Sequence, residues 1–161
     1  MFRRTYPRVL AYARTMAGAA DAEDAVAEAF ATAWRRRNDI PAHAQLGWMI
    51  GVTRRVLANR RRTDRRLGAL RERLAFQRNS LEAPGPIDLL DRGLRDELAA
   101  LPATDREALL LVAWFDLSPT DAAQVLGITP AAFRMRLTRA RRRMSPHLDP
   151  SLTKEPRWQT H

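Results

Sequence analysis

Apolar residues recur every three or four positions along most of the chain, which is the spacing of amphipathic helices. In the N-terminal part, this spacing predicts helices over residues 2–17, 21–34 and about 44–62. It continues more weakly through residues 63–77, which either extend the third helix or lie apart from it. No stretch alternates apolar and polar residues as a half-buried strand does. The pattern therefore predicts a bundle of helices.

A cluster of turn-forming residues interrupts the helical pattern at residues 79–86, which read NSLEAPGP. Proline and glycine so close together favour a linker over any regular element. We therefore predict two domains, residues 1–62 and 87–147, joined by a flexible linker over 63–86 and followed by a tail over 148–161. The expected fold class is all-α, with two small helical bundles of which the second ends in a helix-turn-helix.

Two helices are predicted to open the second bundle. Leucines at helical spacing mark the first of them over residues 87–101, and Pro102 ends it. The sequence Thr104-Asp-Arg-Glu107 has the form of a capping box, so the next helix should begin there. That helix is expected to bury Ala108, Leu111, Val112 and Phe115.

Residues 117–144 carry the signals of a helix-turn-helix. Ser118 is a suitable N-cap before Pro119, Gly127 is suited to the turn, and Thr129-Pro130 repeats the start signal for a second helix. One side of this second helix is a narrow apolar stripe, made by Phe133, Leu137, Ala140 and Met144. The opposite side is predicted to hold Ala131, Arg134, Met135, Thr138, Arg139 and Arg142.

The second helix of this motif has the composition of a DNA recognition helix. Small and polar side chains near its N-terminus could reach base edges, while cations along its length could bind phosphates. Arginine occupies positions 134, 136, 139, 141, 142 and 143, with no acidic residue between them. Such cations repel one another unless something anionic covers them, which favours DNA binding over the alternative of a solvated basic face.

The charge of the whole chain agrees with a polyanionic partner. Its 161 residues carry a net charge of +10, and all but one of the 28 basic residues are arginine, which binds phosphate and guanine in a bidentate manner. Cysteine is absent, which excludes disulfides and thiol chemistry. No apolar run reaches membrane-spanning length and the first residues lack a signal-peptide core, so we expect a cytoplasmic protein without membrane insertion.

The first bundle has charged outer faces whose role the residues alone leave open. On the second helix, Asp24, Glu28 and Arg35 face outward, where the acids could simply serve the helix dipole and solubility. The third helix is rich in arginine on its outer side, which suits phosphates but also a solvated surface. Gly47 and Gly51 are predicted on that same side, where they either weaken the helix or mark the close approach of another backbone.

Two of these motifs, in this order, resemble the sigma-70 family, in its extracytoplasmic-function (group four) subfamily. Residues 21–35, DAEDAVAEAFATAWR, resemble the family's second conserved region, and residues 100–141 resemble its fourth. The resemblance implies a promoter-specificity subunit with no catalytic activity and no cofactor. It also implies three partners: core RNA polymerase, promoter DNA and an anti-sigma factor.

The resemblance assigns expected roles to individual residues. Those expected to bind polymerase are Asp21, Asp24, Glu28 and Arg35. Those expected at the minus-ten element are Trp48, Arg54, Arg55, Arg61 and Arg62, although a tryptophan such as Trp48 is more often a core residue in the family. Those expected at the minus-thirty-five element are Ala131, Arg134, Met135, Arg136, Thr138, Arg139 and Arg142, of which Arg134, Met135 and Thr138 would read bases.

Some positions depart from the family pattern. Arg55 stands where the family often has asparagine, Ala27 replaces a frequent glutamine, and Phe133 and Met135 replace smaller residues in the recognition helix. These departures concern which promoter is read.

Two other classes of function compete with the sigma role. A free-standing helix-turn-helix regulator would need a dimerisation surface to grip a palindrome, and the N-terminal half shows no strong seam for one. An enzyme is disfavoured because His43, His147 and His161 are scattered and no carboxylate cluster has metal-binding spacing.

Overall fold

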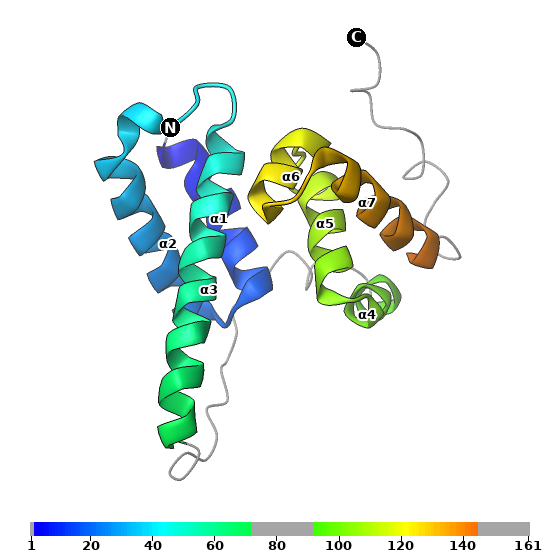
Figure 1. The fold of residues 1–161 in the computed structure, drawn as a ribbon, viewed down its shortest axis with the longest axis horizontal. Helices are drawn as coiled ribbons and strands as arrows, with labels where there is room; N and C mark the ends of the chain where they lie inside the picture. Colours follow the sequence, from blue (N-terminus) through cyan, green and yellow to red (C-terminus); the bar gives the residue numbers. More distant parts are fainter. Residues whose placement is uncertain (1, 72–91, 145–161) are drawn as a thin grey trace. The chain divides into compact units, whose positions relative to one another are not determined.

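The computed structural model describes residues 2–71 and 92–144, and all regular elements in these residues are helical. The contacts divide the chain into two compact units, Met1–Leu89 and Leu90–His161, each with its own helices (Figure 1). The prediction of an all-α fold built from two helical bundles is confirmed. The expected tail at 148–161 and the expected linker from 72 onward lie outside the described residues.

The first unit is a three-helix bundle of α1 (Phe2–Met16), α2 (Ala19–Arg35) and α3 (Gln45–Arg71), with a short 3-10 helix, η1 (Arg37–Asp39), between the last two. Each of the three α-helices packs against both others, side by side in Figure 1. The core forms because each helix contributes one apolar stripe. Its large buried members include Val9, Tyr12, Val26, Phe30, Met49, Ile50, Val56 and Leu57.

The start and end of α2 differ from the prediction. The helix begins at Ala19 with Gly18 as its N-cap residue, so Asp21 lies in the first turn and does not cap. Its charge still suits the positive end of the helix dipole there. At the other end, the helix was predicted to close at Trp34 and continues to Arg35. Ala33 is the last buried residue of its stripe, and Trp34, one residue further and turned by about 100°, is 63% exposed.

The third helix, α3, extends beyond the residues whose apolar spacing predicted it most clearly. It continues past Arg62 to Arg71, so the first part of the segment expected as linker is helical. Gly47 and Gly51 were predicted on the outer side, and this was wrong: both are buried. Because α3 packs against α1 and α2 at once, it needs a wide buried face, and residues without a side chain let neighbouring backbones come close.

The second unit contains α4 (Arg92–Ala100), α5 (Ala103–Ala113), α6 (Pro119–Leu126) and α7 (Pro130–Met144). Helix α5 packs against both α6 and α7, which also contact each other. The predicted capping box does not form, because α5 begins at Ala103 and the carbonyl of Pro102 accepts the first backbone N–H groups. Val112 is only half-buried, whereas Leu109 and Leu110 are buried.

The helix-turn-helix has the caps that its sequence predicts. The Ser118 hydroxyl oxygen accepts the backbone N–H of Asp121 at 3.1 Å, so Ser118 caps α6. Gly127 has a φ of 67°, the left-handed conformation that glycine adopts most easily, and ends that helix. The Thr129 hydroxyl accepts the N–H of Ala132 at 3.2 Å at the start of α7. The predicted stripe is buried throughout: Phe133, Leu137, Ala140 and Met144.

Candidate nucleic-acid interface and acidic docking face

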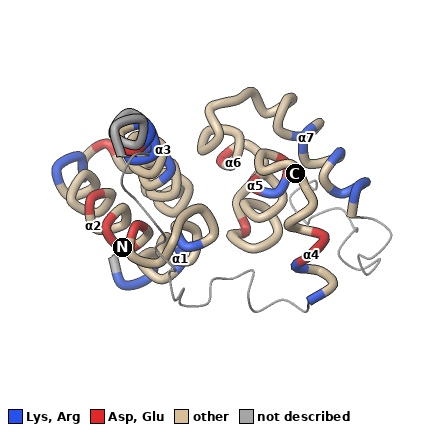
Figure 2. The backbone as a smooth tube through the Cα atoms, turned by 90° about the horizontal axis from the view of Figure 1, so that it is seen from below, with Lys and Arg blue, Asp and Glu red and all other residues tan. Residues whose placement is uncertain are grey.

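The outward face of α7 is as predicted from its periodicity. The residues expected there are all exposed: Ala131, Arg134, Met135, Thr138, Arg139 and Arg142. Arg136, also expected to bind phosphate, lies at the edge of this face and is half-buried. Figure 2 shows basic residues along α7 and no acidic ones. This face therefore presents positive charge outward, as a DNA-binding helix does. We call it the recognition face.

One arginine of α7 is used inside its own unit. Arg143 Nη1 lies 2.8 Å from Asp105 Oδ2 of α5, and the Asp105 side chain is only 6% exposed. A charge-assisted hydrogen bond of this length offsets part of the desolvation cost of the buried carboxylate. The pair joins the first turn of α5 to the last turn of α7, and so helps to fix the orientation of the recognition face.

The variant Arg143→Ala is expected to lower the free energy of unfolding of the second unit by about 1–3 kcal/mol, because it leaves a buried carboxylate without its cation. Hydrogen exchange of the α5 and α7 amides in the full chain measures this loss. The matched control is Arg139→Ala on the same helix. Because the Arg139 side chain is exposed, its removal should lower the free energy of unfolding by less than about 0.5 kcal/mol. Equal losses in both variants would contradict the anchoring role of Arg143.

The arginines expected to act at the minus-ten element lie on α3. Arg55, Arg61 and Arg62 are exposed, while Trp48 and Arg54 are half-buried. Arg61 donates to the Met16 carbonyl at the end of α1, and Arg62 donates to Asn59 Oδ1 at 2.9 Å. Arg54 and Arg61, like Arg55 and Arg62, are seven residues apart, so each pair lies on one side of the helix. The half-buried position of Trp48 fits a core residue with one accessible edge.

The residues expected to bind polymerase share one face of α2. Asp21, Asp24, Glu28 and Arg35 are all exposed, and their spacings of three, four and seven residues place them on the same side of the helix. Arg35 donates to Thr32 Oγ1 at 3.1 Å within α2. We call the part of this face around the three carboxylates the acidic face.

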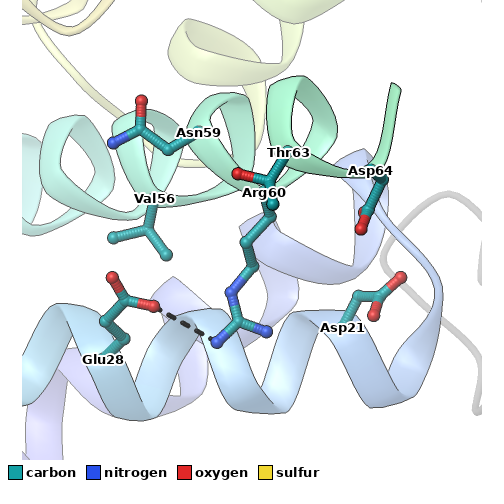
Figure 3. Close-up of a pocket in the computed structure, with 7 residues that line it drawn as sticks. All are labelled: Asp21, Glu28, Val56, Asn59, Arg60, Thr63 and Asp64. Carbon is teal, nitrogen blue, oxygen red and sulfur yellow. Dashed lines mark hydrogen bonds and ion pairs between the residues drawn. The ribbon is translucent and has the colours of Figure 1, made fainter. Parts of the chain in front are cut away.

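Sequence reasoning missed the cation that contacts the acidic face. Arg60 of α3 places Nη1 3.4 Å from Asp24 Oδ2 and Nη2 3.2 Å from Glu28 Oε2. Figure 3 shows the guanidinium reaching from α3 across to Glu28 on α2. The only signal in the sequence was the position of Arg60 four residues after the buried Val56, which places it beside the stripe that packs on α2.

A surface groove of about 310 Å³ lies between α2 and α3 at this point (Figure 3). Its walls carry three carboxylates, those of Asp21, Glu28 and Asp64, against the one guanidinium of Arg60. The surroundings of the groove are therefore net acidic despite the internal ion pairs. Because the side chains of Asp24 and Glu28 are 72% and 53% exposed, their ion pairs contribute little stability and can rearrange for a partner at low cost.

In residues 2–71 and 92–144, no group of three or more His, Asp or Glu side chains is placed to hold a metal ion. None of their helices combines the length and the apolar character that a membrane span requires. His43 is exposed in the turn before α3, and His147 and His161 lie outside the described residues.

Two family models match the chain, one in each unit. Residues 1–67 match Sigma-70 region 2 and contain α1, α2 and most of α3. Residues 91–144 match Sigma-70 region 4 and contain α4 to α7. The matches therefore coincide with the two units that carry the acidic face and the recognition face.

A protein from Xanthomonas campestris pv. campestris, named as probable RNA polymerase sigma factor RfaY, is 32% identical to the chain over 130 residues. The alignment covers 76% of this chain and 32% of that protein, so the chain spans about a third of the length of this relative. The similarity therefore concerns the aligned third of RfaY and not the rest of that protein.

Two solved structures share the fold. One is the sigma factor RpoE from Bartonella quintana in complex with the anti-sigma factor NepR, with a TM-score of 0.69, 23% identity, and coverage of 97% of this chain and 96% of that chain. The other is CnrH in complex with the cytosolic domain of CnrY, with a TM-score of 0.59, 24% identity, and coverage of 92% and 85%. With regions 2 and 4 both present in this order, the chain belongs to the sigma-70 family of RNA polymerase sigma factors, in its extracytoplasmic-function group.

Proposed function

We propose that this chain is a dissociable promoter-specificity subunit, which binds core RNA polymerase and directs transcription initiation from minus-ten and minus-thirty-five elements. It has no catalytic activity of its own, and the polymerase supplies the chemistry. The observation that carries the proposal is the presence in one chain of two units, one with an acidic docking face and the other with a basic helix-turn-helix. A free-standing regulator would not need the first of these.

In the first unit, the acidic face of α2 docks on polymerase and α3 acts at the minus-ten element. Asp21, Asp24, Glu28 and Arg35 supply the docking contacts. Strand opening requires cations that hold the displaced backbone and surfaces that receive unpaired bases. The cations are Arg54, Arg55, Arg61 and Arg62 of α3, with Trp48 beside them.

In the second unit, α7 enters the major groove at the minus-thirty-five element. Arg134, Met135 and Thr138 on its outward side read bases, with Ala131 close to them at the N-terminal end. Arg136, Arg139 and Arg142 steady the helix on phosphates. A single recognition helix reads only a few base pairs, so specific binding depends on the polymerase that holds both units on one promoter.

The proposal also covers location and regulation. A subunit of this kind works in the cytoplasm, where polymerase and chromosome are. An anti-sigma factor is a further proposed partner, and the solved complex of RpoE with NepR is an example of such a pair in a protein of the same fold. For the functional boundaries we propose residues 1–62 and 87–147, the bounds expected from the sequence, with the helix α3 itself continuing to Arg71.

The test is to measure binding of the full chain to core RNA polymerase and then transcription from a pool of genomic promoters. Tight binding together with new start sites is the expected result, and the start sites would reveal the promoter motif. If the chain ignored polymerase and alone protected a palindromic DNA site, it would be a free-standing regulator instead.

A further inference from the structure

Met135 is a long apolar side chain on an otherwise polar and basic helix face. It is 67% exposed, whereas the apolar stripe of α7 is buried throughout. A methionine this exposed gains little from folding, because most of its apolar surface stays in water. Its position at the centre of the recognition face therefore suits a contact with something that binds this face.

Two neighbours of Met135 on this face, one turn before and one turn after it, add apolar groups and no free hydrogen-bond donor. Ala131 lies four residues before it and Thr138 three residues after it, so all three share one side of α7. Ala131 offers only a methyl group. The Thr138 hydroxyl donates its proton to the Arg134 carbonyl at 2.9 Å, so it has none left to donate to a base. We call these three residues the apolar strip.

Arginines border the apolar strip. Arg139 and Arg142 are exposed and carry the positive charge that attracts phosphates to this face. With phosphates held by arginine, the strip would face the base edges in the major groove. Of the four bases, only thymine presents a methyl group there, and an apolar side chain recognises it by contact.

We propose that Met135 reads thymine in the minus-thirty-five element through the 5-methyl group of the base, with Ala131 and Thr138 extending the apolar contact. The inference rests on the proposed function, since it requires the recognition face to lie in the major groove of a promoter. It adds the chemical identity of the base group that is read. Thymine should consequently occupy at least one position of the element opposite Met135.

The experiment uses the complex of the full chain with core RNA polymerase on a promoter that it transcribes. Each thymine of the minus-thirty-five element, on either strand, is replaced in turn by deoxyuridine, which keeps the base pair and removes only the methyl group. Loss of one methyl contact should weaken promoter binding about fourfold at one or two positions. Binding that is equal for thymine and deoxyuridine at every position, or an element without thymine, would overturn the proposal.

Two variants of Met135 assign the effect to this side chain. With Met135→Ala, the ratio of affinities for thymine and deoxyuridine should fall to near one, while Met135→Leu, which keeps an apolar side chain of similar volume, should preserve the wild-type ratio. A wild-type ratio in Met135→Ala would assign the methyl contact elsewhere and refute the proposal.

Arg139→Ala provides a control for general DNA affinity. It should weaken binding to thymine and deoxyuridine promoters alike, and flatten the dependence on salt by about one phosphate contact. A chain that formed no complex with polymerase would contradict the proposed function itself. A transcribing complex that is insensitive to the methyl group would contradict only the thymine contact.

Discussion

The double variant Asp24→Arg/Glu28→Arg is expected to weaken binding to core RNA polymerase by about 100-fold or more. Both carboxylates lie on the exposed acidic face of α2. A surface that binds them must offer complementary positive charge, and like charges juxtaposed in an interface cost several kcal/mol, while about 1.4 kcal/mol already corresponds to tenfold in affinity. Competition between labelled wild-type chain and the variant for core polymerase measures the change.

The control for this variant follows from Arg60. In the double variant, the guanidinium of Arg60 would face two arginines where it now lies beside two carboxylates, so charge repulsion between α2 and α3 would lower the stability of the bundle by a small amount. Adding Arg60→Glu restores attraction between α2 and α3 with the signs exchanged. The triple variant should recover the stability of the bundle, measured by urea unfolding, without recovering affinity for polymerase.

The outcome of the triple variant separates docking from folding. If it bound polymerase as the wild type does, the loss in the double variant would come from a distorted bundle, and the acidic face would not be the docking surface. A further comparison is Glu23→Arg on the same helix, which breaks the 3.0 Å pair with Arg14 of α1 outside the acidic face. That change should leave the polymerase affinity within about twofold, as expected for an isolated exposed pair.

The elements with local signals could be predicted from the sequence. In the helix-turn-helix, Ser118 and Thr129 cap their helices with their own hydroxyl groups, and Gly127 adopts the left-handed turn. Each of these features depends on residues fewer than five positions apart, so the pattern alone determines it. The buried stripe of α7 follows from the same short-range periodicity.

The features that sequence missed depend on residues far apart in the chain. Asp105 and Arg143 are 38 positions apart, and Arg60 is 32 positions from Glu28. Which arginine of a basic run meets a carboxylate depends on how the helices pack, and periodicity of one helix carries no such information. The buried Gly47 has the same explanation, since its environment comes from the other helices of its bundle.

The capping error at α5 has a different cause. Thr104 and Glu107 have the right spacing for a capping box, but Pro102 sits before them and its fixed φ suits the residue at a helix start. The helix therefore begins earlier, and Glu107 becomes a buried residue within it. Thr104 and Glu107 thus marked the place where a helix starts without supplying its cap.

The variant Phe133→Ala is expected to unfold the second unit while leaving the first one folded. Phe133 is 0% exposed, and removing a buried phenylalanine side chain costs about 3–5 kcal/mol. A helical unit of this size has a total stability of only about 5 kcal/mol. In hydrogen exchange on the full chain, the amides of α5, α6 and α7 should lose most of their protection, while those of α1, α2 and α3 keep theirs.

Function should divide in the same way. Phe133→Ala should retain its affinity for polymerase, because the acidic face belongs to the first unit, and should lose recognition of the minus-thirty-five element. Phe133→Leu is the matched control: it removes less apolar volume, so it should cost about 1.5 kcal/mol or less and keep the unit folded. If Phe133→Ala removed protection from α1, α2 and α3 as well, the two units would fold as one cooperative body, and docking and promoter reading could not be separated by mutation of one core.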